Sequence, residues 1–346
     1  MKSVLHWLLV TAALAFVAFQ APALVRSALA GGAQLGDLRW HWVAASVVLG
    51  LAAVAVYAEL HRKLLAVGGA HLPHGLVQSI TFAENAIANT VPVVGGAGSL
   101  AYAISRFRRR GVDSALAAWA VLLAGVVDTL CLLALAAIAL AVVGRLSVPL
   151  AMLLVVMVAA GAVGAWALVT HPAVMHALLR PLLWLGRFVP SRCPQCRSFR
   201  SADLTGRTNR VAARLALLRP SAPQWSWLVA VTVLSWLLDF ANMAAAGAAV
   251  LQQVPWPALV VGFLVVQASI ALQVLPGGAG LAEVGLLGIL LAVGVAPGPA
   301  ALTVLVYRSS SWLLPAIAGW VAYGVHIHVL RPRPHPHHSY GPQPAI

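Results

Sequence analysis

Long apolar runs separated by short polar loops dominate the chain. A helix needs about 20 apolar residues to cross the hydrocarbon core of a bilayer. Runs of roughly that length predict six transmembrane helices, at residues 4–23, 40–57, 115–143, 148–169, 225–251 and 300–326. The first run could also serve as a signal peptide, but its length favours a full span.

Two further apolar regions, residues 75–105 and 257–295, each contain a glycine-rich break with the letters Gly-Gly-Ala-Gly and a proline shortly before it. Proline lacks an amide donor and glycine adopts positive φ easily, so each break leaves polar backbone groups unpaired. In lipid, such backbone is tolerated only where protein buries it or where it lines a wet cavity. Each region is therefore either a re-entrant hairpin or a pair of short crossings.

The pattern predicts an all-α polytopic membrane protein with six transmembrane helices and two broken, re-entrant elements. Arginine clusters fall on one side of the predicted spans, and the positive-inside rule makes that side, with both termini, cytoplasmic. We divide the chain into a first helix with its outer loop, a first half, a connecting helix, a basic cytoplasmic loop, a second half and a disordered tail: residues 1–39, 40–143, 144–169, 170–224, 225–328 and 329–346.

The two halves each read as helix, broken element, helix, and parity places them in opposite orientations. Matching breaks in two halves of a membrane chain are typical of transporters built as inverted repeats, with the transport site at the repeat interface. We therefore expect an inverted repeat with a site where the two breaks meet.

Composition supports a membrane protein, since 61% of the 346 residues are hydrophobic and only 9% are charged. The net charge of +14 comes from short clusters between spans, which favours contacts with anionic lipids over binding of nucleic acid. Cys131, Cys193 and Cys196 do not form a disulfide framework, and a lone C-x-x-C is weak evidence for zinc or redox chemistry. We expect no metal, no cofactor and no enzymatic activity.

Charged groups inside spans are costly and are functional candidates by default. Five qualify: Glu84, Asp128, Asp239, Glu283 and Arg308. Asp239 shares one helical face with Thr232, Ser235 and Asn242, which either lines a cavity or fixes helix packing. The scattered histidines, His61 among them, lie near predicted span ends, where interfacial packing is the simpler interpretation.

The guanidinium of Arg308 can grip two phosphate oxygens, and the amides of the second break can hold an anion. The alternative is that Arg308 only neutralises Glu283 or Asp239. The full set of predicted substrate-binding residues is Glu84, Asn85, Asn89, Gly95, Gly98, Asp128, Asp239, Pro276, Gly277, Gly278, Gly280, Glu283 and Arg308.

At these residues the chain resembles the lysylphosphatidylglycerol synthase transmembrane region family, whose members are also described as flippase-like. The likeness is carried by residues 89–98 with Arg106 and Gly111, and by residues 275–283, 294–295, 307–308, Trp312, Pro315 and Gly319. It implies movement of anionic or modified lipids, or lipid-linked envelope assembly. The sequence ends shortly after the last span, without the length of a soluble aminoacyl-transferase domain, so we do not expect lysyl transfer.

The leading hypothesis is a lipid translocase of the cell membrane that moves an anionic or modified headgroup along a polar path while the acyl chains stay in lipid. One alternative is a non-transporting accessory subunit of envelope lipid or glycan synthesis, with a protein partner on the basic loop. Such a subunit should show Glu283 and Arg308 packed together without a cavity. The other alternative is a small-solute or ion transporter of similar design.

Overall fold

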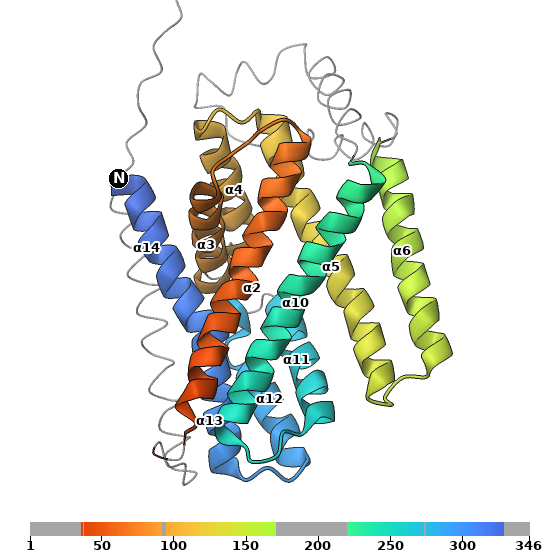
Figure 1. Cartoon of the computed structure of the whole chain (residues 1–346), viewed down its shortest axis with the longest axis vertical. Coiled ribbons are helices and arrows are strands. Elements are labelled where there is room, and N and C mark those ends of the chain that lie inside the picture. Colours follow the sequence, from red (N-terminus) through yellow and green to blue (C-terminus); the bar gives the residue numbers. More distant parts are fainter. Residues whose placement is uncertain (1–35, 37, 92–94, 171–219, 273–274, 329–346) are drawn as a thin grey trace, which may run out of the picture.

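The computed structural model describes residues 36, 38–91, 95–170, 220–272 and 275–328, and all elements within these ranges are helices (Figure 1). The predicted span at residues 4–23, the tail and most of the basic loop, including Cys193 and Cys196, lie outside the described residues. The described part of the chain is all-α, as predicted.

Four long apolar stretches confirm four of the predicted spans: α2 (Trp40–Val67), α5 (Ser114–Val142), α10 (Ala222–Val250) and the Pro297–Val325 stretch of the last helix. The next apolar helix, α6 (Val148–Thr170), contributes a shorter apolar segment, Val148–Gly164. With residues 4–23 undescribed, the predicted number of six spans is not established.

Helix ends follow from local sequence. Asp113 caps α5 because its side chain accepts a hydrogen bond from the amide of Ala115 at 3.1 Å. Ser221 and Gln224 form a capping box at the start of α10, which has a proline in its first turn. These caps set where both long helices begin.

Helix α2 continues to Val67, well past the end predicted at residue 57. The prediction ended the span before Glu59, Arg62 and Lys63, but Glu59 pairs with Arg62 on one side of the helix, with 2.7 Å between Arg62 Nε and Glu59 Oε2. On the opposite side His61 is completely buried. His61 therefore packs inside the protein, and its predicted place near the membrane interface stays a prediction.

Both broken regions form helical hairpins. The first consists of α3 (His74–Thr90) and α4 (Gly95–Arg109), and the second of α11 (Trp256–Ala271), a 3₁₀ turn (Pro276–Gly278) and α12 (Leu281–Ala292). In Figure 1 the α3–α4 hairpin occupies the upper half of the molecule and the α11–α12 hairpin the lower half. Contacts between α3 and the 3₁₀ turn join the two breaks near the middle.

The two Gly-Gly-Ala-Gly motifs differ in conformation. The sequence predicted that the first motif belongs to the break. Instead, Gly95 and Gly98 already belong to α4, so this motif is the start of a helix. A Cβ on Gly95 would lie 2.7 Å from the carbonyl oxygen of Ala88, so the glycine serves close packing of α4 on α3. The second motif directly follows Pro276, and its glycines Gly277, Gly278 and Gly280 all have positive φ. These conformations break the helix.

The sequence predicted one regular helix at residues 300–326, but the last helix is interrupted. It consists of α13 (Pro297–Arg308), a π-helical segment (Ser309–Leu313) and α14 (Leu314–His328). Pro315 has no amide to donate to the carbonyl of Ser311, so regular α-helical bonding cannot continue through this point. Short π-helical turns of this kind are frequent at functional sites.

Helices α2 and α10 run side by side through the centre (Figure 1), and the hydroxyl of Ser235 on α10 donates to the carbonyl of Ala53 on α2 at 2.9 Å. One buried apolar cluster surrounds the first hairpin and includes Leu64, Ile80 and Phe107. The second surrounds the other hairpin and includes Leu259 and Leu286. Polar residues lie between these two clusters.

Candidate functional site

A cavity of about 380 Å³ lies between the two apolar clusters. Its walls come from both hairpins, from α2, α5 and α10, and from the junction of α13 with the π-helical segment. The lining residues are Gly50, Ala53, Val54, Tyr57, Thr81, Glu84, Asn85, Ala88, Asn89, Ser99, Leu100, Asp128, Ser235, Trp236, Asp239, Gln267, Ile270, Tyr307, Arg308, Ser311 and Trp312. The volume falls in the range of small-molecule sites, about 300–1,000 Å³.

Charged side chains from four helices converge on this cavity. Glu84 comes from α3, Asp128 from α5, Asp239 from α10 and Arg308 from the end of α13. Four of the five intramembrane charges that the sequence predicts as site residues thus share one space, together with Asn85 and Asn89. The fifth, Glu283, lies behind Arg308.

Arg308 joins the cavity to the second break. Its Nε donates to Glu283 Oε1 at 2.6 Å and its terminal nitrogen donates to the carbonyl of Gly277 at 2.7 Å. Both side chains are almost fully buried, with 3% and 9% exposure. The ion pair expected in the alternative interpretation of Arg308 is therefore present, and Arg308 also lines the cavity.

The polar face predicted on α10 is confirmed. Asp239 accepts a hydrogen bond from Gln267 Nε2 at 2.9 Å, which links α10 to the second hairpin. Farther along the same face, Asn242 Oδ1 lies 2.6 Å from the hydroxyl of Ser46 and 2.7 Å from that of Ser310. This buried network ties α2, α10 and the π-helical segment together beside the cavity.

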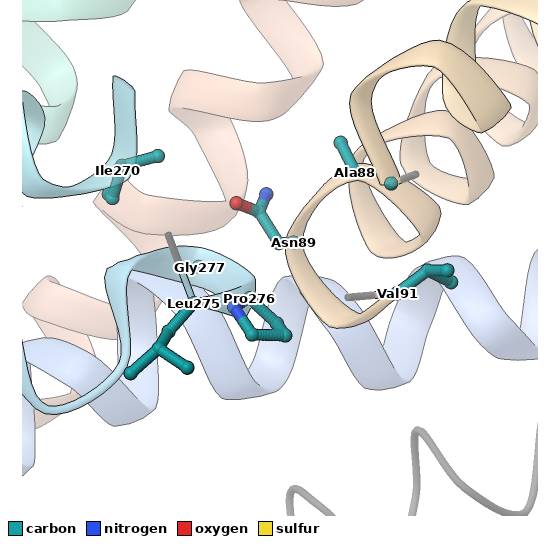
Figure 2. A pocket seen from close by; sticks show the side chains of 8 residues that line it. Ala88, Asn89, Val91, Ile270, Leu275, Pro276 and Gly277 are labelled. Carbon is teal, nitrogen blue, oxygen red and sulfur yellow. The ribbon is translucent and has the colours of Figure 1, made fainter. Parts of the chain in front are cut away.

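A second, smaller cavity of about 110 Å³ lies between the two breaks. Figure 2 shows Asn89 pointing toward the second break, opposite Pro276 and Gly277. Asn89 lines both cavities, and its carbonyl accepts a hydrogen bond from Trp312 Nε1 at 3.1 Å. The breaks therefore face each other, as the matching sequence motifs predict, with Gly95 on the same small cavity.

Four of the predicted site residues, Gly98, Gly278, Gly280 and Glu283, line neither of these two cavities. The amide of Gly278 donates to the carbonyl of Leu275 at 3.0 Å, and the amide of Ala279 to that of Pro276 at 3.1 Å. These two amides are thus used within the turn. The second break offers Arg308 a carbonyl oxygen. The role of the break in holding an anion stays a prediction.

Sequence reasoning missed several polar residues of the site: Tyr57, Thr81 and Gln267 on the cavity wall, Ser46 in the Asn242 network, and His61 behind Glu84. Gln267 gave a signal, since an uncharged amide in an apolar run needs a partner. Among the residues that the structure describes, no three His, Cys, Asp or Glu side chains gather as a metal site would require.

The described structure is that of a multi-pass, all-helical membrane protein with a charged internal cavity between two broken helical hairpins. The chain belongs to the lysylphosphatidylglycerol synthase TM region family, whose pattern it matches over residues 4–319. A comparison with curated proteins gave no match. Membership of this family ties the protein to lipid metabolism or lipid flipping.

Proposed function

We propose that the protein is a lipid translocase that passes a headgroup through the larger cavity while the acyl chains remain in the bilayer. The observation that carries this proposal is the convergence of Glu84, Asp128, Asp239 and Arg308 on one cavity between the two breaks. Intramembrane charges that face an internal cavity are typical of substrate pathways. Family membership supports a lipid as the cargo.

The charges of the cavity indicate what the headgroup carries. Three carboxyl groups and one guanidinium line the cavity, and the guanidinium is already paired with Glu283. A purely anionic headgroup would meet an excess of acidic groups. We therefore infer a modified headgroup with a phosphate, which Arg308 contacts, and a positively charged amine, which the carboxylates of Asp128 and Asp239 contact.

The same proposal includes the topology. We infer that the hairpins are re-entrant and enter from opposite sides, within halves at residues 40–143 and 225–328 that form an inverted repeat, and that the span at 4–23 completes six crossings. Support comes from Figure 1, where the hairpins occupy opposite halves of the molecule. The end of α4, with Arg106, Arg108 and Arg109, lies at the upper end together with the end of α2. By the positive-inside rule that end is cytoplasmic in the cell membrane, as are both termini.

The accessory-subunit alternative is less well supported. It predicted Glu283 and Arg308 packed against each other without a cavity, whereas here Arg308, paired with Glu283, lines a cavity of about 380 Å³. A rigid packing element has no need for buried acids on an internal space, because each unpaired buried polar group costs stability.

The experiment is flipping in proteoliposomes with lipids labelled on the acyl chain, so that each headgroup stays intact. Anionic phosphatidylglycerol, zwitterionic phosphatidylethanolamine and an aminoacylated phosphatidylglycerol are compared. We expect fast protein-dependent flipping of the amine-bearing lipids and at least a tenfold loss in Arg308→Met and Asp239→Asn, which corresponds to about 1.4 kcal/mol. Glu59→Gln is the control, because Glu59 lines neither cavity.

If a well-folded sample flips none of these lipids, the translocase proposal is wrong, and the search for a protein partner of the basic loop at residues 170–224 takes its place. Flipping of phosphatidylglycerol alone would retain the translocase but refute the amine-bearing headgroup.

A further inference from the structure

A buried histidine and a buried glutamate meet at the wall of the cavity. His61 on α2 is fully buried and Glu84 on α3 is 7% exposed, with His61 Nε2 3.9 Å from Glu84 Oε2. Neither of these two atoms has a hydrogen-bond partner among the residues that the structure describes. Glu84 lines the cavity and His61 lies directly behind it.

The surroundings of His61 are apolar except on the side of Glu84. The edge of the Tyr57 ring packs on the imidazole with 5.0 Å between ring centroids, and Phe107 follows at 6.3 Å. The only close polar contact of the other ring nitrogen among the described residues is the Thr81 hydroxyl, 3.4 Å from His61 Nδ1. No lysine or arginine is paired with Glu84 within the described part of the chain.

Charge counting shows what this pair can bind. With one proton the pair is neutral overall, whether it exists as imidazolium and carboxylate or as two uncharged groups. Without that proton a single negative charge remains in a buried site, which is unfavourable unless a positive group replaces the proton. Because Glu84 faces the cavity, a cation in the cavity is positioned to be that replacement.

We propose that His61 and Glu84 form a proton-binding pair whose proton and a positively charged group of the lipid headgroup exclude each other. This inference rests on the proposed translocase function and adds its energy source. When the amine of a headgroup enters, the pair releases one proton to water in the cavity, and when the headgroup leaves, the pair takes one proton up. Such mutual exclusion couples the two movements in opposite directions, and by linkage the proton weakens headgroup binding as much as the headgroup weakens proton binding.

Other titratable and charged groups act on this pair through the same space. They are Tyr57 on α2, Tyr102 on α4, Asp128 on α5, Asp239 on α10, and Tyr307 and Arg308 on α13. The carboxylate of Asp239 accepts a hydrogen bond from Gln267 on α11, whereas at Asp128 Trp236 Nε1 donates to the backbone carbonyl. Within this set, Glu84 is the carboxyl group whose nearest ionisable neighbour is a histidine.

The test measures the leaflet distribution of an acyl-labelled phosphatidylethanolamine in proteoliposomes, with the membrane potential held at zero by potassium and valinomycin. For exchange of one proton per lipid, we expect a gradient of one pH unit to shift the wild-type distribution by about tenfold toward one leaflet. In His61→Asn and His61→Gln the final leaflet distribution should no longer follow the gradient, whatever the rate at which each variant reaches it. Two variants of His61 are used so that misfolding of one does not decide the result.

The matched control is the pair between α2 and the first residue of α3, where His74 Nδ1 lies 3.3 Å from Glu59 Oε2 and the His74 side chain is 67% exposed. His74→Gln should respond to the gradient like the wild type. Flipping without any response to the gradient in the wild type would overturn the proton pair and leave the translocase intact. Absence of flipping at every pH would refute the translocase and, with it, this inference.

Discussion

The Glu283–Arg308 ion pair offers the sharpest test of how the site is held together. It is short, with 2.6 Å between Nε and Oε1, and its side chains are 9% and 3% exposed. Removing one partner of such a buried pair leaves an uncompensated charge and typically costs about 3–5 kcal/mol. We expect Glu283→Gln and Arg308→Met each to lower the free energy of unfolding by that amount.

The double variant Glu283→Gln/Arg308→Met should lose less than the sum of the two single losses, by roughly 1–3 kcal/mol, because the second change removes the charge that the first left unpaired. The partly buried Glu59–Arg62 pair is the control, with side chains 19% and 24% exposed. Glu59→Gln should cost about 1 kcal/mol or less, since partly solvated pairs contribute little.

The assay is equilibrium unfolding in detergent followed by tryptophan fluorescence, for which Trp312 is well placed because its ring centroid lies 5.4 Å from the guanidinium carbon of Arg308. Additive losses in the double variant, or single losses no larger than that of Glu59→Gln, would show that the pair does not stabilise the second break.

Two glycines provide further predictions. A Cβ at Gly319 would overlap the carbonyl oxygen of Phe82. Gly319→Ala should therefore force α14 away from α3 and lower the free energy of unfolding by roughly 1–3 kcal/mol. Gly324→Ala on the same helix is the control and should not destabilise the protein, because a Cβ there meets open space. At Gly277, φ is +59° and a Cβ would lie 2.2 Å from Trp312 Nε1, so Gly277→Ala should both strain the turn and abolish flipping. Gly280→Ala carries only the strain of positive φ, about 1–2 kcal/mol, and should keep activity; equal flipping in both variants would refute the role of the Trp312 contact. Unfolding and flipping assays measure all four variants.

The all-α membrane fold and the positions of the two breaks could be predicted because both depend on local rules. Apolar length sets the spans, and proline with glycine sets the breaks. The conformation of the breaks could not be predicted from the motif. Gly95 and Gly277 stand in the same four-letter motif, but only Gly277 directly follows a proline and has positive φ. Identical letters therefore took different structures from their neighbours.

The charged part of the site was predicted because a charge inside a span has few explanations. The place of His61 beside the site was not predicted, because the position of His61 relative to the core depends on how far α2 extends beyond Tyr57. The π-helical segment was also missed. Helix-period reasoning assumes one repeat throughout, and the wider turn that rotates Trp312 toward Asn89 has no signal beyond Pro315.

The last helix is hydrogen-bonded to both breaks. Arg308 donates to the carbonyl of Gly277 in the second break, while Trp312 and Trp320 donate to Asn89 and Thr90 at the end of α3. The acceptors at Gly277 and Asn89 are backbone carbonyl groups, and in lipid an unpaired backbone group costs several kcal/mol. In the proposed translocation cycle, opening of the cavity must therefore either carry both hairpins along with the last helix or replace these donors by water or headgroup groups. Because Arg308 immediately precedes the π-helical segment and Trp312 lies within it, a rotation at this segment changes the hydrogen bonds of both breaks in one step.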